Sequence, residues 1–188
     1  MLGAFALAET YPFHHYRSRD GLVQDQAFSI YQDPRGYIWI GTFGGLSRYD
    51  GQSFQNFSLK DGLPSASIHA VFQDRLGRTW VGTPNGAARL DGKRFVPHRF
   101  RSFKSPPPVY AVQESADGVL WFATRDGLLE WRADRERLYG TRDGLPGTSV
   151  MCMVPGPDGW LYAGTTGGLC RIRDGRVEGF PQLNEAED

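Results

Sequence analysis

Short runs of apolar residues alternate along the chain with turns that contain glycine. Runs bounded by glycine, proline or Asp-Gly pairs are typical of β-strands joined by tight turns. No window keeps the 3.6-residue period of an amphipathic helix. In one representative stretch the pattern predicts four strands, at residues 68–73, 79–83, 88–90 and 95–100.

The first run of each such group is nearly continuously apolar, as in residues 68–73 and 109–112. A strand that is covered on both faces needs this pattern, whereas a strand with one solvated face alternates. We therefore expect the first strand of each group to be the innermost.

The whole pattern recurs at an interval of 41 residues. Residues 36–51 read GYIWIGTFGGLSRYDG and residues 77–92 read GRTWVGTPNGAARLDG. Repetition at a fixed interval indicates a repeat architecture. Four columns keep the interval through the chain: Gly36, Gly77, Gly118 and Gly159; Trp39, Trp80, Trp121 and Tyr162; Thr42, Thr83, Thr124 and Thr165; and Gly45, Gly86, Gly127 and Gly168.

A tandem unit of four antiparallel strands and about 40 residues is typical of a β-propeller blade. We predict an all-β chain whose propeller segment spans residues 9–188. The tryptophan column is expected to fill the wedge between neighbouring blades, and the glycine and threonine after it to let backbones approach closely. The predicted repeats cover residues of about 20–60, 61–101, 102–142 and 143–183.

The strand count favours an incomplete ring. Residues 13–17 lie one period before residues 54–58 and are predicted to form a lone fourth strand, although residues 177–180 already supply the last blade with one. A four-bladed ring with a redundant strand is the alternative to the front part of a seven-bladed type of propeller. An open arc leaves apolar faces uncovered, so the expected partners are the remaining blades of a parent protein or a second copy.

Composition excludes some functions. Lys and Arg together number 21, as do Asp and Glu, so no basic field favours nucleic acid or a membrane surface. No run of about 18 apolar residues is present, so this segment is not expected to contact a membrane. Residues 1–8 end in an Ala-x-Ala pattern (Ala6, Ala8), which resembles the end of a signal peptide cleaved after Ala8. A merely apolar N-terminus is the alternative.

Candidate catalytic and metal-binding residues are few. His14 and His15 would point to opposite faces of a strand, and His69 and His98 occupy columns that hold aromatic residues in other repeats. These positions predict no metal site, no cofactor and no catalytic residue, and no nucleophile or phosphate-binding motif occurs.

The cysteines and the repeated aspartates have structural explanations. Cys152 and Cys170 replace small residues on strands about 9–10 Å apart, so we expect two free, buried thiols. A disulfide formed in an oxidising periplasm is the alternative. Asp20, Asp61 and Asp143 each precede Gly-Leu, which predicts turn residues that cap backbone amides rather than a catalytic carboxylate set.

A ligand-binding rim can be predicted from propeller geometry. Loops before each first strand share a face with loops between the second and third strands, and their residues vary between repeats while the columns do not. Arg125 with Asp126 is the strongest candidate, because this charged pair departs most from the other repeats. Solvated loop residues without a ligand are the alternative. The candidates are Gln24, Asp25, Gln26, Phe43, Ser65, Ser67, Asn85, Arg125, Asp126, Thr148 and Ser149.

Two segments resemble a known repeat. Residues 61–95, DGLPSASIHAVFQDRLGRTWVGTPNGAARLDGKRF, and residues 20–54, DGLVQDQAFSIYQDPRGYIWIGTFGGLSRYDGQSF, resemble the two-component regulator propeller repeat. The third and fourth copies are looser, with Ala123 in place of glycine and Tyr162 in place of tryptophan. The resemblance covers residues 13–180.

In that family the propellers form the extracytoplasmic sensor of membrane-anchored signalling proteins, whose output is a histidine kinase or a diguanylate cyclase. The resemblance implies a non-enzymatic periplasmic sensor segment, anchored to the inner membrane in its parent, that takes a small ligand such as a glycan. No kinase, cyclase or membrane-spanning signature lies in these residues. The alternatives are a secreted propeller enzyme such as a lyase, which loss of turnover on changing His69 would support, and a pure interaction scaffold.

Overall fold

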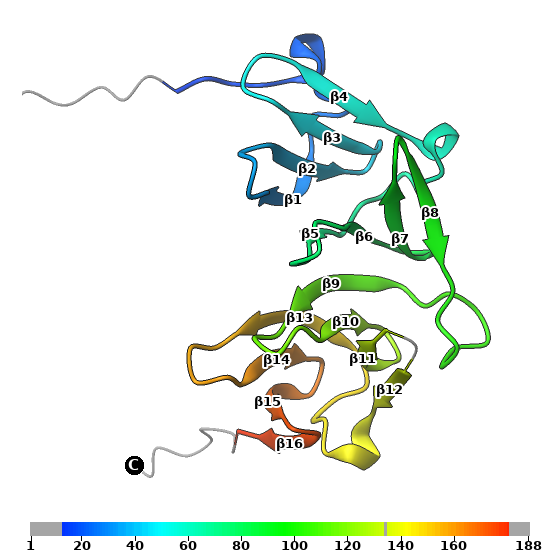
Figure 1. The fold of residues 1–188 in the computed structure, drawn as a ribbon, viewed down its shortest axis with the longest axis vertical. Helices are drawn as coiled ribbons and strands as arrows, with labels where there is room; N and C mark the ends of the chain where they lie inside the picture. Colours follow the sequence, from blue (N-terminus) through cyan, green and yellow to red (C-terminus); the bar gives the residue numbers. More distant parts are fainter. Residues whose placement is uncertain (1–12, 134, 181–188) are drawn as a thin grey trace, which may run out of the picture.

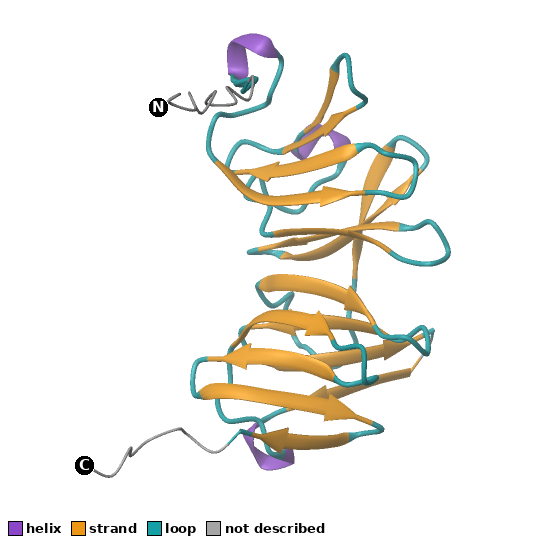
Figure 2. Ribbon diagram, turned by 90° about the vertical axis from the view of Figure 1, so that its left-hand side faces the viewer, coloured by secondary structure: helices purple, strands orange, loops and turns teal. Residues whose placement is uncertain are grey.

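The computed structural model describes residues 13–133 and 135–180. These residues form sixteen strands and three short 3-10 helices, and the strands make four antiparallel sheets of four strands each. Figures 1 and 2 show the sheets stacked one after another along the longest axis of the molecule. The predicted all-β fold of four antiparallel propeller blades is confirmed. The signal peptide predicted at residues 1–8 lies outside the described residues.

The four blades have the same strand order, since each strand pairs with the next in sequence. Blade 1 consists of β1 (Ala27–Gln32), β2 (Ile38–Thr42), β3 (Leu46–Tyr49) and β4 (Phe54–Phe57). Blade 2 consists of β5 (Ala70–Gln73), β6 (Thr79–Thr83), β7 (Gly86–Asp91) and β8 (Arg94–His98). Blade 3 consists of β9 (Val109–Glu114), β10 (Leu120–Thr124), β11 (Gly127–Arg132) and β12 (Arg135–Tyr139). Blade 4 consists of β13 (Val150–Pro155), β14 (Leu161–Thr165), β15 (Gly168–Arg173) and β16 (Arg176–Gly179).

The first strands of consecutive blades lie against one another: β1 contacts β5, β5 contacts β9, and β9 contacts β13. These strands therefore line the inner side of the row, as their apolar sequences predict. Blade 1 and blade 4 lie at opposite ends of the long axis (Figure 1).

The tryptophan column forms the core between the blades. Trp39 is buried in the cluster between blades 1 and 2, Trp80 between blades 2 and 3, and Trp121 between blades 3 and 4. A buried indole contributes a large apolar area in a single rigid side chain, which suits a wedge-shaped gap. The predicted packing role of these residues is confirmed.

The glycines two residues after Trp39 and Trp80 let neighbouring blades approach. A Cβ atom at Gly82 would lie 2.8 Å from the carbonyl oxygen of Val109 in the next blade. The same relationship holds between Gly41 and Ile68, at 2.8 Å. Close contact between backbones requires a residue without a side chain at these positions.

The aspartate of each Asp-Gly-Leu segment ends a short 3-10 helix, which the sequence did not predict, and the glycine caps that helix. In the second of them the backbone N–H of Ser58 donates to Oδ2 of Asp61 at 2.8 Å, which lowers the pKa of that carboxyl. Gly62 follows with φ of +91°, and a Cβ there would collide with the carbonyl oxygen of Phe95. The predicted capping role of these aspartates is confirmed. The helices are η1 (Ser18–Asp20), η2 (Leu59–Asp61) and η3 (Thr141–Asp143).

The strand predicted at residues 13–17 is wrong. These residues are exposed and form no strand, and η1 begins directly after them. A lone fourth strand needs a third strand with a free edge, and every third strand among the described residues, including β15 of the last blade, is already paired on both edges. Tyr16 instead packs its ring against Tyr49 and Phe54, with centroids 5.0 and 5.6 Å away. The strand-count argument for an incomplete ring therefore has no support from this segment.

Candidate functional site

Two loops meet at one edge of each blade, as the sequence analysis expected: the loop before the first strand and the loop between the second and third strands. In blade 2 the side-chain amide of Asn85 donates to the carbonyl oxygen of Pro64 at 3.1 Å. In blade 3 the N–H of Arg125 donates to the carbonyl oxygen of Pro108 at 3.2 Å. This edge is the frame on which a ligand could be held.

A threonine fixes the loop between the second and third strands in every blade. In blade 3, Oγ1 of Thr124 donates to the carbonyl oxygen of Gly127 at 2.7 Å and accepts from the N–H of Asp126 at 3.2 Å. The equivalent bond from threonine to glycine measures 2.9 Å in blade 1 and 2.8 Å in blades 2 and 4. The loop backbone is thus held rigidly, while the residues between threonine and glycine remain free to vary.

The blade 1 candidates contact residues that are near them in the sequence. Oδ1 of Asp25 accepts from the N–H of Ser18 at 2.6 Å, which lowers the pKa of that carboxyl. The side chain of Gln24 accepts from the N–H of Gln26 at 2.9 Å. Phe43 packs edge-to-face against Phe28, with ring centroids 3.8 Å apart, and half of its surface is exposed.

The blade 2 and blade 4 candidates are less prominent. Oγ of Ser65 accepts from the N–H of Ser67 at 3.2 Å, so this hydroxyl serves its own turn. Thr148 is exposed, and the hydroxyl of Ser149 lies 3.4 Å from the sulfur of Met151. Neither group offers a charged contact to a ligand.

Arg125 and Asp126 in blade 3 form an exposed ion pair. Nε of Arg125 lies 3.5 Å from Oδ1 of Asp126, and their side chains are 63% and 49% exposed. A pair this exposed adds little to stability, so its charges are available to another group. Among the described residues, no hydrogen bond or ion pair joins candidate side chains of different blades.

The structure shows a cavity that the sequence analysis missed. It has a volume of about 260 Å³ and lies where the third repeat replaces Asp-Gly-Leu with Ser105-Pro106-Pro107-Pro108. Its wall is mostly apolar and includes two exposed cationic residues, Arg99 and Lys104. The replacement of Asp-Gly-Leu by this proline-rich segment is the feature of the sequence that marks the position of the cavity. The lining residues are Pro97, His98, Arg99, Phe100, Phe103, Lys104, Ser105, Pro106 and Pro107.

His98 borders this cavity and packs among aromatic rings. Its ring lies edge-on to Trp80 at 5.3 Å and to Trp131 at 5.4 Å. Its Nε2 atom is buried and has no partner within the described residues. Burial lowers the pKa of this imidazole. His98 is therefore a packing residue, as its column predicts.

His69 and the cysteines complete the candidate chemistry. His69 stacks on Tyr110 with centroids 5.4 Å apart, and its Nδ1 lies 3.3 Å from the carbonyl oxygen of Val109. Both cysteines are free, and Cys170 is buried. The prediction that Cys152 is buried was wrong. Its side chain lies on the outward face of blade 4, and no further blade covers this face within the described residues. Those residues contain no cluster of three or more potential metal ligands.

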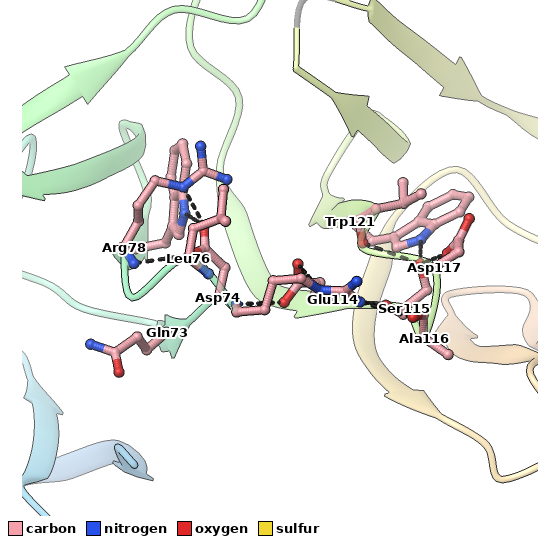
Figure 3. Close-up of polar contacts among 12 residues, drawn as sticks. Gln73, Asp74, Leu76, Arg78, Glu114, Ser115, Ala116, Asp117 and Trp121 are labelled. Atoms are coloured by element: carbon pink, nitrogen blue, oxygen red, sulfur yellow. Dashed lines mark hydrogen bonds and ion pairs between the residues drawn. The ribbon is translucent and has the colours of Figure 1, made fainter. Parts of the chain in front are cut away.

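The opposite edge of the blades carries a polar network of a structural kind (Figure 3). Arg75 in the β5–β6 turn donates to the carbonyl oxygens of Ser115 and Ala116 at 3.0 and 2.9 Å and pairs with Glu114 at 3.0 Å. It thereby ties the β9–β10 turn to blade 2. These acceptors are thus used by the protein itself, and the network holds blades 2 and 3 together.

Two stretches of the chain, residues 21–44 and 62–85, match the family model described as two component regulator propeller. The comparison with curated protein sequences gives no match. None of the described helices is long and apolar enough to cross a membrane.

Solved structures share the fold over most of the chain. The extracellular domain of an inferred hybrid two component system from B. thetaiotaomicron is 26% identical, with a TM-score of 0.76 over 89% of this chain and 24% of its own. A second such domain from that organism is 27% identical, with a TM-score of 0.70 over 86% and 22%. The chain thus spans about a quarter of the length of these structures.

Virginiamycin B lyase from Staphylococcus aureus is similar in fold, with 17% identity and a TM-score of 0.68 over 84% of this chain and 56% of the lyase. At that identity the likeness concerns the fold alone. The family match and the extracellular domains agree with each other and with the observed blades. The family model described as two component regulator propeller thus matches two of the four repeats, and the described residues share the β-propeller fold of these solved structures.

Proposed function

We propose that this chain is an extracytoplasmic ligand-sensing segment of a membrane-anchored signalling protein with a histidine kinase or diguanylate cyclase output. The observation that carries the proposal is the similarity, above 25% identity, to the extracellular domains of two inferred hybrid two component systems. The output domain and the membrane anchor would belong to the parent protein, and the signal would pass to a phosphorelay or to cyclic dinucleotide synthesis.

The ligand in this proposal is small and polar, such as a glycan, and binds at the edge that carries Arg125 and Asp126. Three features support this placement. The threonine-to-glycine bonds hold the loops rigidly, so little conformational entropy is lost on binding. The ion pair offers both donors and acceptors, and its exposure leaves them accessible. The residues at this edge differ between blades, whereas the frame does not.

A thermal-shift screen against glycans and amino acids tests the proposal, because a ligand that binds only the folded chain raises its Tm. A stabilising ligand should lose its effect on Arg125→Ala and on Asp126→Ala. Lys93→Ala is the matched control, since Lys93 is an exposed cation in the β7–β8 hairpin, away from the candidate edge. Lys104→Ala distinguishes binding in the cavity at residues 97–107 from binding at Arg125 and Asp126.

Two results would contradict the proposal. If no compound in the screen raises the Tm of the folded chain, a pure interaction scaffold is favoured. Catalytic turnover of a sugar or peptide that is lost on His69→Ala favours an enzyme of the lyase class. The packing of His69 against Tyr110 argues against that second outcome.

A further inference from the structure

Two sheet faces, at opposite ends of the row of blades, expose residues whose counterparts in the other blades are buried. On the outward face of blade 1, Ile30 is 76% exposed. One, two and three periods later, Val71, Val112 and Met153 are 8%, 3% and 7% exposed. The same position is therefore a core position in three blades and a surface position in one.

The outward face of blade 4, at the other end of the row, shows the same pattern. Leu169 is 48% exposed, while its counterparts Leu46, Ala87 and Leu128 are at most 1% exposed. Phe180 is 42% exposed, and its counterpart Tyr139 in blade 3 is fully buried. Exposed apolar patches of this kind mark interaction surfaces.

Consecutive blades contact each other three times within the chain. Each contact joins a face of the kind exposed on blade 4 to a face of the kind exposed on blade 1. Leu46 and Val71 lie in the cluster between blades 1 and 2, as do Ala87 and Val112 between blades 2 and 3. Leu128 and Met153 lie in the cluster between blades 3 and 4. The next pair in this series is Leu169 of blade 4 with the position that Ile30 occupies in blade 1, at the other end of the row.

Charged and aromatic side chains on the outward face of blade 4 already have partners within the blade. The guanidinium of Arg171 donates to Oε2 of Glu178 at 3.0 and 2.8 Å, so the charged pair on this face is already neutralised. The rings of Tyr162 and Phe180 stack with centroids 6.1 Å apart. Covering this face would not leave an isolated charge without a partner.

We propose that the partner is a second copy of this chain, bound head-to-tail, so that blade 4 of each copy packs on blade 1 of the other. The assembly would contain two identical contacts related by a twofold axis and eight blades, within the four to eight that propellers use. This inference goes beyond the proposed function, since it requires no ligand and no output domain. It gives Leu169 and Ile30 the partners that their counterparts have.

The mass of the chain in solution tests the proposal. Sedimentation equilibrium should give twice the 21.0 kDa of one chain. Leu169→Asp and Ile30→Asp should each weaken association by at least 100-fold, because a charge would have to be buried in the contact. Leu76→Asp is the matched control, since Leu76 is 70% exposed in the β5–β6 turn, away from both faces. It should leave the dimer intact.

A mixing experiment establishes the head-to-tail arrangement. Ile30→Asp retains an intact blade 4 face and Leu169→Asp retains an intact blade 1 face, so the two variants should form a 1:1 complex although neither associates with itself. If only one of the two substitutions dissociates the dimer, the contact joins like faces and the proposal is wrong. A wild-type chain that is monomeric at all concentrations overturns it, whether its faces stay bare or are covered by other segments.

Cys152 provides an independent measurement. It lies on the outward face of blade 4 and is exposed in the single chain. Its reaction with a thiol reagent should slow as the wild-type concentration rises, and should stay fast at every concentration in Leu169→Asp. A labelling rate that is independent of concentration in a wild-type dimer would contradict contact at this face.

Discussion

The indole Nε1 of Trp80 donates a hydrogen bond to Oδ2 of Asp74 at 2.9 Å, and both residues are buried. Trp39 makes the same bond to Asp33 at 3.0 Å, six residues before it. In blade 3, Trp121 donates to the hydroxyl of Ser115 at 3.1 Å. Each wedge-filling indole is thus both packed and oriented by the turn that precedes its strand.

Asp74→Ala should destabilise the chain by about 2–4 kcal/mol, because it leaves a buried indole N–H and the guanidinium of Arg78 without their acceptor. Asp74→Asn should cost less, since the amide oxygen can still accept one bond. Urea denaturation measures both changes. Asp91→Ala, at an exposed hairpin position, is the control and should be neutral. Equal stability of Asp74→Ala and wild type would show that the bond does not matter.

Gly82→Ala should cost about 1–3 kcal/mol, because the added methyl group would press on the carbonyl oxygen of Val109 and force blades 2 and 3 apart. Gly140→Ala is the matched control, since nothing lies within 4 Å of a Cβ atom there. Thermal denaturation of the two variants compares them directly. A Tm of Gly82→Ala at or above that of Gly140→Ala would refute the close-approach explanation.

Stability should fall as the pH drops below about 6.5, in part through His98. Burial holds the pKa of His98 below its ordinary value, an effect that Arg89 and Arg78 reinforce and Glu136 opposes. The unfolded chain therefore takes up this proton first, and its protonation favours unfolding in acid. His98→Phe, which places the residue of the equivalent position Phe57, should flatten this part of the profile of unfolding free energy against pH. An unchanged profile would exclude His98 as its source.

The buried thiol of Cys170 should affect the stability of the chain at high pH rather than in acid. Burial raises the pKa of Cys170 to about 11, whereas an unfolded thiol ionises near 9. The unfolded chain then loses this proton first, so stability is lost as the pH rises from about 9 to 11. In a Cys152→Ser background, Cys170 should react with a thiol reagent only as fast as the chain unfolds. Rapid labelling of the native Cys152→Ser chain would show that Cys170 is accessible.

The interval of 41 residues was sufficient to predict the blades, the burial of Trp39, Trp80 and Trp121, and the close approach at Gly82, because these properties repeat with the sequence. It did not reveal the bonds from Asp33 and Asp74 to the indoles, although both aspartates keep the interval. Asp33 and Asp74 come directly after the first strands of their blades, so the strand pattern predicts only turn positions for them.

Properties that depend on a residue's place in the row were not predictable from its column. Cys152 shares a column with Ala70 and Ala111, which face a following blade, whereas Cys152 faces none among the described residues. The cavity beside Lys104 arises where the third repeat abandons the pattern, so no periodicity indicates its shape. A strand was expected at residues 13–17 because the period was extended to a segment that has no third strand to pair with.

Trp80 is fully buried between blades 2 and 3, whereas Tyr162 in the last blade is only partly buried. In a single chain kept from associating, for example Leu169→Asp, each blade is stabilised only by its immediate neighbours, so local opening should begin at the two ends and reach the middle last. Amide hydrogens of β6 and β10 should consequently exchange with deuterium far more slowly than those of β2 and β14, although all four strands have nearly the same sequence pattern. Position along the row, rather than local composition, would then set the lifetime of each hydrogen bond.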